Sequence, residues 1–215
     1  MTPTAAASGA PPSAALREAF GDIDIYLFDQ LLRGRFDGVR TVLDAGCGGG
    51  RNLVYLLRGG FAVHGVDRDA RSVERVRRLA AELAPGLPAE NFQVAEVDAL
   101  PFADAAMDAV ISSAVLHFAA DEAHFGRMVD EMWRVLRPGG LLFARLASSI
   151  GIEARVRPLG GGRHYLPDGS ERFLVDEAGL LARTEALGGV LLDPIKTTNV
   201  QNLRAMTTWC VRKSQ

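Results

Sequence analysis

The chain has 215 residues and a formal net charge of −2, with 48% hydrophobic and 23% charged residues. This length suits one substantial domain, and the composition is that of a globular rather than a disordered protein. The nearly neutral charge gives no strong attraction to nucleic acid or to an anionic membrane surface. No apolar run reaches about 18 residues, so the sequence predicts no membrane-spanning helix.

Residues 1–15 are rich in Ala, Pro, Ser and Thr, and they lack the basic start and long apolar run of a secretion signal. We therefore expect a flexible tail over residues 1–15, a single domain over residues 16–215 and a cytoplasmic protein. Two cysteines cannot by themselves form a disulfide framework or a four-ligand zinc site. The four histidines show no metal-ligand spacing, so no metal is expected.

From residue 39 onward, short apolar runs alternate with stretches of helical periodicity. The apolar runs that predict strands cover residues 42–43, 61–66, 92–97, 108–113 and 141–146. Asp69 and Asp121 are suited to cap the helices that follow the second and fourth runs. Residues 137–140, Arg-Pro-Gly-Gly, predict a turn before the fifth strand. Continuous apolar strands separated by helices indicate a doubly wound α/β fold with a mostly parallel sheet.

The alternation stops after Ser148. Residues 150–172 contain several glycines and prolines and predict a long irregular segment, a kind of segment that is usually functional or mobile. A helix is expected over residues 176–187, followed by strands over 190–192 and 206–211. Because no convincing helix lies between the last two strands, we expect them to run antiparallel.

The strongest functional signal is the segment 44–50, Asp-Ala-Gly-Cys-Gly-Gly-Gly, where a strand turns into a helix. Glycines let the backbone approach a ligand closely, and a helix N-terminus favours anionic groups. Asp67 and Asp98 end the next two predicted strands, and an acid in the first of these places binds a ribose in doubly wound folds. A dinucleotide fingerprint that begins at Gly46 would need a third glycine where the chain has Arg51. For the glycines alone, a plain turn is the alternative.

Five segments carry a likeness to a known family: residues 44–50, 65–67, 97–102, 108–113 and 136–140. In order and spacing they resemble the motifs of class I S-adenosylmethionine-dependent methyltransferases, over about residues 39–148. The resemblance is to the superfamily and its small bacterial members, and it names no substrate. It implies S-adenosylmethionine as cofactor and a Rossmann-like fold, doubly wound, with a mostly parallel seven-stranded sheet and an antiparallel C-terminal strand.

The resemblance places the glycine-rich loop under the methionine part of the cofactor. Gly46, Cys47, Gly48 and Gly50 would form this contact, with Asp44 holding the loop or contacting the ligand. We interpret Cys47 as a small loop residue rather than a nucleophile, because the position needs little bulk.

The resemblance also assigns the adenosine part of the cofactor. Asp67 would bind the ribose hydroxyls, and Asp98 would accept a hydrogen bond from the adenine amino group, near the Ala99 N–H. Arg68 and Leu100 would flank the adenine ring. For Asp98, a structural turn at the strand end is the alternative.

Several polar residues are candidates for the acceptor side. The resemblance assigns Ser113 to cofactor binding, near the reacting methyl group and the acceptor, with a packing role as the alternative. His117 is a candidate general base or polar contact, or it orients a loop. Arg145 is a charge inside an apolar strand, so it is expected to meet an acidic substrate or an enzyme carboxylate. His164 and Tyr165 are further candidates for substrate binding.

Two segments remain to build an acceptor pocket: an N-terminal cap over residues 16–36 and a substrate-side insertion over residues 149–175. Similar methyltransferases often cover the cofactor and the acceptor with their N-terminal segment. Tyr26 is the preferred lid residue and a catalytic candidate. Because the cap has helical spacing, ordinary docking on the core is the alternative.

The predicted function is methyl transfer to a small-molecule acceptor by in-line displacement. A sulfonium is already an activated methyl donor, so the enzyme mainly aligns the acceptor and excludes water. A general base is needed only where the acceptor must lose a proton. The alternatives are a non-catalytic S-adenosylmethionine-binding protein and a methyltransferase for a macromolecule; the protein is expected to be a monomer or a homodimer.

Overall fold

The computed structural model describes residues 12–215. Most of the predicted tail, residues 1–11, lies outside the described residues. Residues 12–15 are helical instead, because helix α1 spans Pro12–Phe20. Proline suits the first position of a helix, since the N–H that it lacks would have no partner within the helix.

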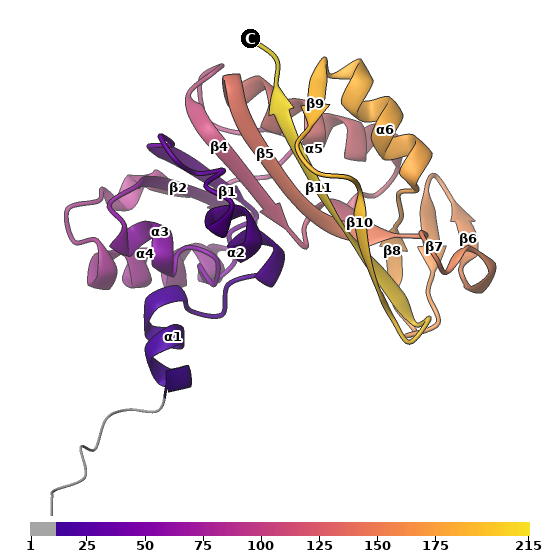
Figure 1. Ribbon diagram of the computed structural model, residues 1–215, viewed down its shortest axis with the longest axis horizontal. Coiled ribbons are helices and arrows are strands. Elements are labelled where there is room, and N and C mark those ends of the chain that lie inside the picture. The colour runs from indigo at the N-terminus through magenta and orange to yellow at the C-terminus, as the bar shows by residue number, and fades with distance from the viewer. Residues whose placement is uncertain (1–11) are drawn as a thin grey trace, which may run out of the picture.

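The core of the protein is a single mixed sheet with the strand order β10-β11-β5-β4-β1-β2-β3, and β9 also pairs with β11 (Figure 1). The strands are β1 (Thr41–Ala45), β2 (Ala62–Asp67), β3 (Phe92–Val94), β4 (Met107–Ser113), β5 (Leu136–Ser148), β9 (Gly189–Leu191), β10 (Lys196–Val200) and β11 (Arg204–Lys213). Strands β1 to β5 pair in parallel, whereas β11 runs antiparallel to β5, β9 and β10. The predicted mostly parallel α/β sheet and its antiparallel C-terminal strand are confirmed.

Helices cover both faces of this sheet. They are α2 (Ile25–Leu32), α3 (Val54–Arg58), α4 (Ala70–Leu83), α5 (Glu122–Val135) and α6 (Glu177–Ala186), with short 3-10 turns η1 (Ala89–Asn91), η2 (Leu116–Phe118) and η3 (Glu153–Arg155). The predicted helix starts are confirmed, because the carboxylates of Asp69, Asp121 and Asp176 each accept a backbone N–H of the first turn. No helix within residues 12–215 is long and apolar enough to cross a bilayer.

Two hydrophobic clusters, one on each face, hold the helices to the sheet. Val42 and Val63 pack with the apolar side chains of α2, α3 and α4. Leu43 and Val66 lie in the other cluster, which contains the apolar side chains of α5. Neighbouring residues of one strand point to opposite faces, so a continuous apolar run serves both clusters. The apolar runs of the sequence therefore have a direct structural cause.

Two predicted boundaries are wrong. The third strand was predicted over residues 92–97, but β3 ends at Val94, because it is the edge strand and pairs only with β2. The predicted turn over residues 137–140 lies inside β5. Leu136 of β5 pairs with Met107 of β4, and a bulge shifts the register between Met107 and Ala109. Gly139 has a φ of +75°, which lets the strand kink there without ending.

The segment predicted to be irregular, residues 150–172, contains strands instead. β6 (Arg157–Gly160), β7 (Arg163–Tyr165) and β8 (Glu171–Phe173) form a small antiparallel sheet. Gly160, Gly161 and Gly162 have φ values of +97°, +58° and +79°, so the glycines that suggested a loop make the turn of a hairpin.

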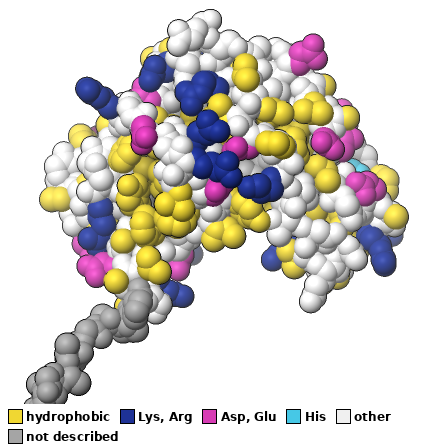
Figure 2. All heavy atoms as spheres, in the orientation of Figure 1, with side chains coloured by type: hydrophobic (Ala, Val, Ile, Leu, Met, Phe, Trp, Pro, Cys, Tyr) yellow, Lys and Arg dark blue, Asp and Glu magenta, His cyan; other side chains and the backbone are white. Residues whose placement is uncertain are grey.

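The carboxyl ends of the parallel strands point toward a concave side of the molecule. In Figure 1 the arrowheads of β4 and β5 lie on the side that is flanked by α1 and α2 at one end and by β6 to β8 at the other. The far tip of the β10–β11 hairpin reaches the same side. Figure 2 shows that the surface is hollowed between these two ends. In open α/β sheets this edge is where ligands bind.

Candidate active site

The glycine-rich loop follows β1 and is fixed to β2. The N–H groups of Gly46 and Cys47 both donate to the Val66 carbonyl, at 2.8 and 2.9 Å. Gly46 and Gly50 have φ values of +86° and +84°, a backbone region that side chains disfavour. A Cβ on Gly46 would lie 2.3 Å from Val115 Cγ2. The loop therefore needs glycine at Gly46 both for its backbone conformation and for the space beside it.

Asp67, at the end of β2, holds this loop. Its Oδ2 accepts the Gly48 N–H at 2.9 Å, and its Oδ1 accepts the Asp69 N–H at 2.9 Å. Each carboxylate oxygen has a further lone pair, so Asp67 can still accept from a ligand. Two backbone bonds orient the carboxylate before any ligand binds.

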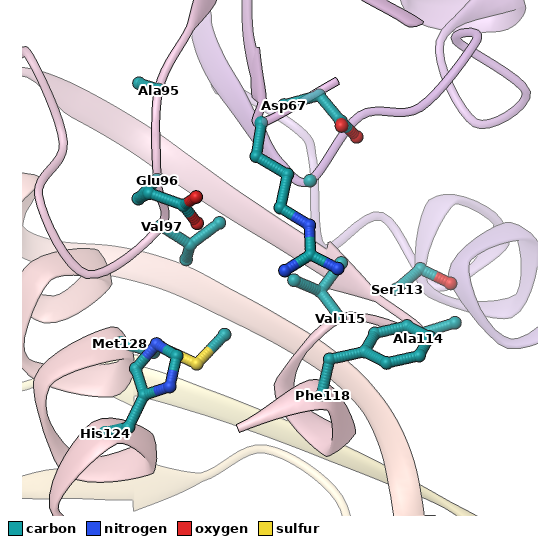
Figure 3. A pocket seen from close by; sticks show the side chains of 12 residues that line it. Asp67, Ala95, Glu96, Val97, Ser113, Ala114, Val115, Phe118, His124 and Met128 are labelled. Atoms are coloured by element: carbon teal, nitrogen blue, oxygen red, sulfur yellow. The ribbon is translucent and has the colours of Figure 1, made fainter. Parts of the chain in front are cut away.

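A cavity of about 220 Å³, here called the loop cavity, opens beside Asp67. It is lined by Gly46, Asp67, Arg68, Ala95, Glu96, Val97, Ser113, Ala114, Val115, Phe118, His124 and Met128. Figure 3 shows Asp67 and Glu96 approaching it from one side and Phe118, His124 and Met128 from the other. Four of the predicted cofactor positions line it: Gly46, Asp67, Arg68 and Ser113. Its mixture of apolar side chains and a few carboxylates suits a nucleoside-sized organic ligand.

The three predicted adenine contacts after β3 do not line this cavity. The Asp98 carboxylate lies 3.4 Å from Arg127 Nε and 3.6 Å from His124 Nε2. The N–H of Ala99 donates to the Glu96 carbonyl, and the N–H of Leu100, a buried residue, donates to Glu131. Because β3 ends early, the chain turns sooner than expected. Residues 95–97 form the wall in place of Leu100.

Cys47 faces the core and not the loop cavity. Burial raises the pKa of its thiol far above the usual value, with the neighbouring Asp44 adding to the effect. A Cβ on Gly65 would come within 3.0 Å of Cys47 Sγ, so the two positions pack closely. This environment agrees with a small packing residue and gives no thiolate for catalysis.

A second cavity of about 310 Å³, here called the arginine cavity, adjoins the first and shares Ala114 with it. Its walls are Ala114, His117, Arg145, Ala147, Leu166, Asp168, Ser170, Arg172, Val200, Arg204 and Met206. These residues come from the ends of β4 and β5, from the predicted insertion over residues 149–175, and from the β10–β11 hairpin. The hairpin was missed as a contributor because β10, Lys-Thr-Thr-Asn-Val, is an edge strand with a mainly polar sequence.

His117 is buried in the wall of the arginine cavity. Its Nδ1 accepts the Ala147 N–H at 3.3 Å, which assigns the ring proton to Nε2. Burial, together with the charge of Arg172, lowers the pKa of His117 to about 4. The ring is therefore neutral at pH 7 and offers an N–H donor. This geometry favours the predicted polar contact over the predicted general base.

A charged cluster that sequence reasoning missed lies where the two cavities meet. Asp24, the N-cap of α2, has its Oδ2 3.5 Å from Arg145 Nη1 and 3.7 Å from Arg51 Nη2, and this oxygen accepts the Ser113 hydroxyl at 3.3 Å. Arg51 Nη2 also donates to Ser113 Oγ at 3.0 Å. Arg145 thus has the enzyme carboxylate that was one of its predicted partners. An acid before a helical run was the only local signal for Asp24.

Tyr26 links the cap to the rest of the site. The Arg145 guanidinium lies 4.5 Å from the centre of its ring, within the range of a cation–π contact. Its hydroxyl is hydrogen-bonded to Thr198 on β10. Tyr26 therefore joins the cap to the β10–β11 hairpin, and its action as a lid stays a prediction.

The two predicted acceptor residues of β7 lie elsewhere. His164 lines a third cavity, with its Nδ1 3.0 Å from the Gly162 carbonyl oxygen. Tyr165 is exposed and stacks with Arg157, whose guanidinium carbon lies 5.1 Å from the ring centre. Leu166, just after this strand, lines the arginine cavity in their place.

Comparison with known proteins shows a likeness to methyltransferases. A family model described as a methyltransferase domain matches residues 43–144. The uncharacterized methyltransferase YodH of Bacillus subtilis is 34% identical over 118 residues, which are 55% of this chain and 45% of that protein. A ubiquinone biosynthesis O-methyltransferase of Mesorhizobium japonicum is 30% identical over 176 residues, 77% of this chain and 64% of the relative. Residues 43–144 of this chain thus match a methyltransferase domain, and a solved S-adenosylmethionine-dependent methyltransferase of Methanosarcina mazei shares its fold, with a TM-score of 0.68 at 19% identity.

The fold of solved methyltransferases extends over almost the whole chain. The crystal structure of the 1,6-didemethyltoxoflavin-N1-methyltransferase of Burkholderia thailandensis superposes with a TM-score of 0.64 at 20% identity. It covers 99% of this chain and 94% of the other. The curated relatives above are longer, and this chain spans about half to two thirds of their length.

The cofactor of this family, S-adenosylmethionine, brings an ammonium group, a carboxylate, two ribose hydroxyls and an adenine. Asp44 is 1% exposed, and both of its carboxylate oxygens lack a hydrogen-bond partner among the described residues. A buried carboxylate without donors is costly, so this residue fits a methyltransferase ligand that supplies N–H groups. No group of three or more His, Cys, Asp or Glu side chains within residues 12–215 is arranged to hold a metal ion.

The burial of Asp44 predicts a pH dependence of stability. Burial raises its pKa to about 7, while Arg51 opposes the rise. In the free protein, the native state holds the Asp44 proton up to about pH 7, whereas the unfolded chain releases it near pH 4. Asp44 therefore makes the protein less stable as the pH rises through that range. From pH 5 to pH 7.5, the free energy of unfolding measured with urea should fall further in the wild type than in Asp44→Asn, by more than about 1 kcal/mol. Parallel pH profiles for the two proteins would contradict this prediction.

Proposed function

We propose that this protein transfers a methyl group from S-adenosylmethionine to a small-molecule acceptor by in-line displacement. The observation that carries the proposal is the junction of the two cavities at Ala114. One cavity presents the glycine-rich loop and Asp67, and the other presents polar and apolar side chains suited to an organic acceptor. An acceptor in the arginine cavity would lie beside the cofactor's reactive end.

The chain offers a complementary group for each polar part of the cofactor. Asp67 binds the ribose hydroxyls, and Asp44 meets the ammonium group. Arg51, which contacts Ser113 beside the loop, binds the methionine carboxylate, because a guanidinium fork matches a planar carboxylate. Arg68 flanks the adenine. When bound, S-adenosylmethionine supplies a sulfonium-activated methyl group whose leaving group is a neutral thioether.

The remaining task of the protein is to position the acceptor and exclude water. Tyr26 and Arg145 close the junction between the cap and β5, and Ser113 stands at the end of β4. His117 donates a hydrogen bond from Nε2 and holds the acceptor in place. Because the pKa of His117 is lowered and its unprotonated nitrogen, Nδ1, already accepts the Ala147 N–H, we propose that the acceptor atom presents a free lone pair without help from this residue.

The names of the relatives do not identify the acceptor of this protein. One is named as a ubiquinone biosynthesis O-methyltransferase and one solved structure as a 1,6-didemethyltoxoflavin-N1-methyltransferase, so the same fold acts on different acceptor atoms. The arginine cavity is about 310 Å³, a size that favours a small molecule over a macromolecule. A non-catalytic protein that holds S-adenosylmethionine is the second candidate, because its binding residues would be the same.

Ligand-dependent melting tests the cofactor part of the proposal. At about 100 times its dissociation constant, S-adenosylhomocysteine should stabilise the native state by about 2.7 kcal/mol. For a chain of this length, that is a rise in Tm of roughly 5 to 10 °C. NAD at the same concentration should cause no shift. A shift with NAD and none with S-adenosylhomocysteine would reject the proposed cofactor.

Turnover tests the catalytic part. We expect release of S-adenosylhomocysteine from S-adenosylmethionine when a panel of thiol, amine, hydroxyl and carboxylate compounds includes a suitable acceptor. The Asp67→Ala variant is the matched control for uncatalysed methylation. Tight binding of S-adenosylhomocysteine without product from any acceptor would favour the non-catalytic binding protein.

A further inference from the structure

The arginine cavity carries an excess of positive charge. Three arginines are among its lining residues, Arg145 on β5, Arg172 on β8 and Arg204 at the start of β11, against one acidic residue, Asp168. These three strands are distant in sequence and meet only through the fold. All three line one cavity, which adjoins the loop cavity at Ala114.

The single carboxylate, Asp168, forms no contact ion pair with these arginines within residues 12–215, although the charges of two of them act on it. Although burial opposes it, hydrogen bonds from Ser170 keep the pKa of Asp168 below its usual value, with help from Arg204 and Arg172. Its Oδ1 accepts both the N–H and the hydroxyl of Ser170, at 3.0 and 2.6 Å. Within residues 12–215, neither Arg172 nor Arg204 forms an ion pair. Arg172 donates only to the Glu171 carbonyl and stacks 5.0 Å from the Phe118 ring centre.

Arg145 is also incompletely neutralised. Only 16% of its side chain is exposed, and its Nε is buried without a hydrogen-bond partner among the described residues. Its one carboxylate partner, Asp24, is shared with Arg51. Burying a guanidinium without full compensation is costly, and such a deficit is relieved by a ligand that carries negative charge.

The rest of the cavity is apolar. Leu166, Met206, Ala147 and Val200 provide walls for a carbon skeleton. Arginine is the side chain best matched to planar oxyanions, which it binds through two parallel N–H donors. The combination selects an organic body with an anionic end, rather than a neutral or cationic acceptor.

We infer that the methyl acceptor is a small organic anion whose carboxylate or phosphate group is held by Arg145, Arg172 and Arg204. This inference rests on the proposed function and names the substrate class of the same site. The anionic group serves as the binding handle and distinguishes acceptors from neutral analogues.

Thermal melting in saturating S-adenosylhomocysteine tests the inference. The probes are aromatic and aliphatic carboxylates, their primary amides of the same shape, and the corresponding phosphate monoesters. At least one anion should raise Tm where its amide does not. Carboxylates and phosphate monoesters, compared at equal concentration, identify which oxyanion the cavity takes.

Variants locate the binding. Arg172→Gln and Arg204→Gln should each weaken binding of the selected anion by about tenfold or more, the usual effect of losing a charge-assisted hydrogen bond. Arg58→Gln, at the end of α3 and outside the arginine cavity, is the matched control and should bind the anion as the wild type does. Calorimetric binding of S-adenosylhomocysteine should be unchanged in all three, which shows that each variant is folded.

Three outcomes would overturn the inference: equal shifts with amides and anions, undiminished anion binding in both cavity variants, or no shift with any anion. The proposed function would survive each of them if S-adenosylhomocysteine binds and a neutral acceptor is methylated. Conversely, anion binding that depends on Arg172 and Arg204 without any S-adenosylhomocysteine binding would reject the proposed function; it would leave an anion site in the arginine cavity but remove the anion's role as methyl acceptor.

Discussion

Replacing Asp67 with alanine should weaken S-adenosylhomocysteine binding by at least about 30-fold. A hydrogen bond to a charged group contributes about 1.5 to 3 kcal/mol, and the proposed role gives this carboxylate two ribose hydroxyls. The variant also loses the bond from the Gly48 N–H, which fixes the glycine-rich loop beside the cavity. Isothermal titration calorimetry of the two proteins at pH 7.5 measures the change directly.

The control for this prediction is Asp176→Ala. It removes the N-cap of α6, where Asp176 accepts the Gly179 N–H at 2.7 Å, and should cost about 1 kcal/mol of stability. Because α6 does not line the loop cavity, the Asp176→Ala variant should bind S-adenosylhomocysteine with the affinity of the wild type. Unchanged affinity in Asp67→Ala would remove the assigned role of this residue.

Replacing Gly46 with alanine should damage both stability and cofactor binding. The left-handed backbone costs an alanine about 1 to 2 kcal/mol. The added Cβ would lie 2.3 Å from Val115 Cγ2, so the loop or Val115 must move. Val115 lines the loop cavity, and its displacement should lower affinity for S-adenosylhomocysteine by about tenfold or more, since about 1.4 kcal/mol is a tenfold change.

Gly60→Ala separates the two causes. Gly60 has a φ of +74° but nothing within 4 Å of the position of a Cβ, so its variant carries backbone strain without a steric clash. Urea unfolding should show that Gly60→Ala lowers the free energy of unfolding less than Gly46→Ala does. Calorimetry should show that Gly60→Ala binds S-adenosylhomocysteine with unchanged affinity. Equal stability and equal affinity for the two variants would contradict the proposed crowding at Gly46.

The parts of the fold that sequence predicts well are those with local causes. Asp69, Asp121 and Asp176 mark helix starts because a carboxylate satisfies free N–H groups within three residues. Continuous apolar runs predict strands covered on both faces. The glycine-rich loop is predictable because its backbone conformation excludes side chains, as Gly46 shows.

The parts that sequence does not predict depend on contacts between distant segments. Asp24 and Arg145 are 121 residues apart, and no local pattern signals their contact. Strand β10 is mainly polar and gains its structure from pairing with β11. The arginine cavity likewise gathers residues from β5, β8 and β11, so its charge becomes visible only in the folded protein.

Local environment explains the differences at individual site residues. His117 was a plausible base from its place after β4, but the bond from the Ala147 N–H and its burial make it a neutral donor. Leu100 stays a predicted adenine contact, but residues 95–97 line the loop cavity and Leu100 does not, while its N–H donates to Glu131. Such effects require coordinates, because they depend on which atom each backbone group meets.

A crystal structure with S-adenosylhomocysteine bound tests the central claim most directly. The ligand should occupy the loop cavity, with its ribose hydroxyls on the Asp67 carboxylate and its methionine carboxylate beside Arg51. Its sulfur should face the junction with the arginine cavity at Ala114. Ligand density at another place, or an empty loop cavity in crystals grown with saturating S-adenosylhomocysteine, would contradict the proposed site.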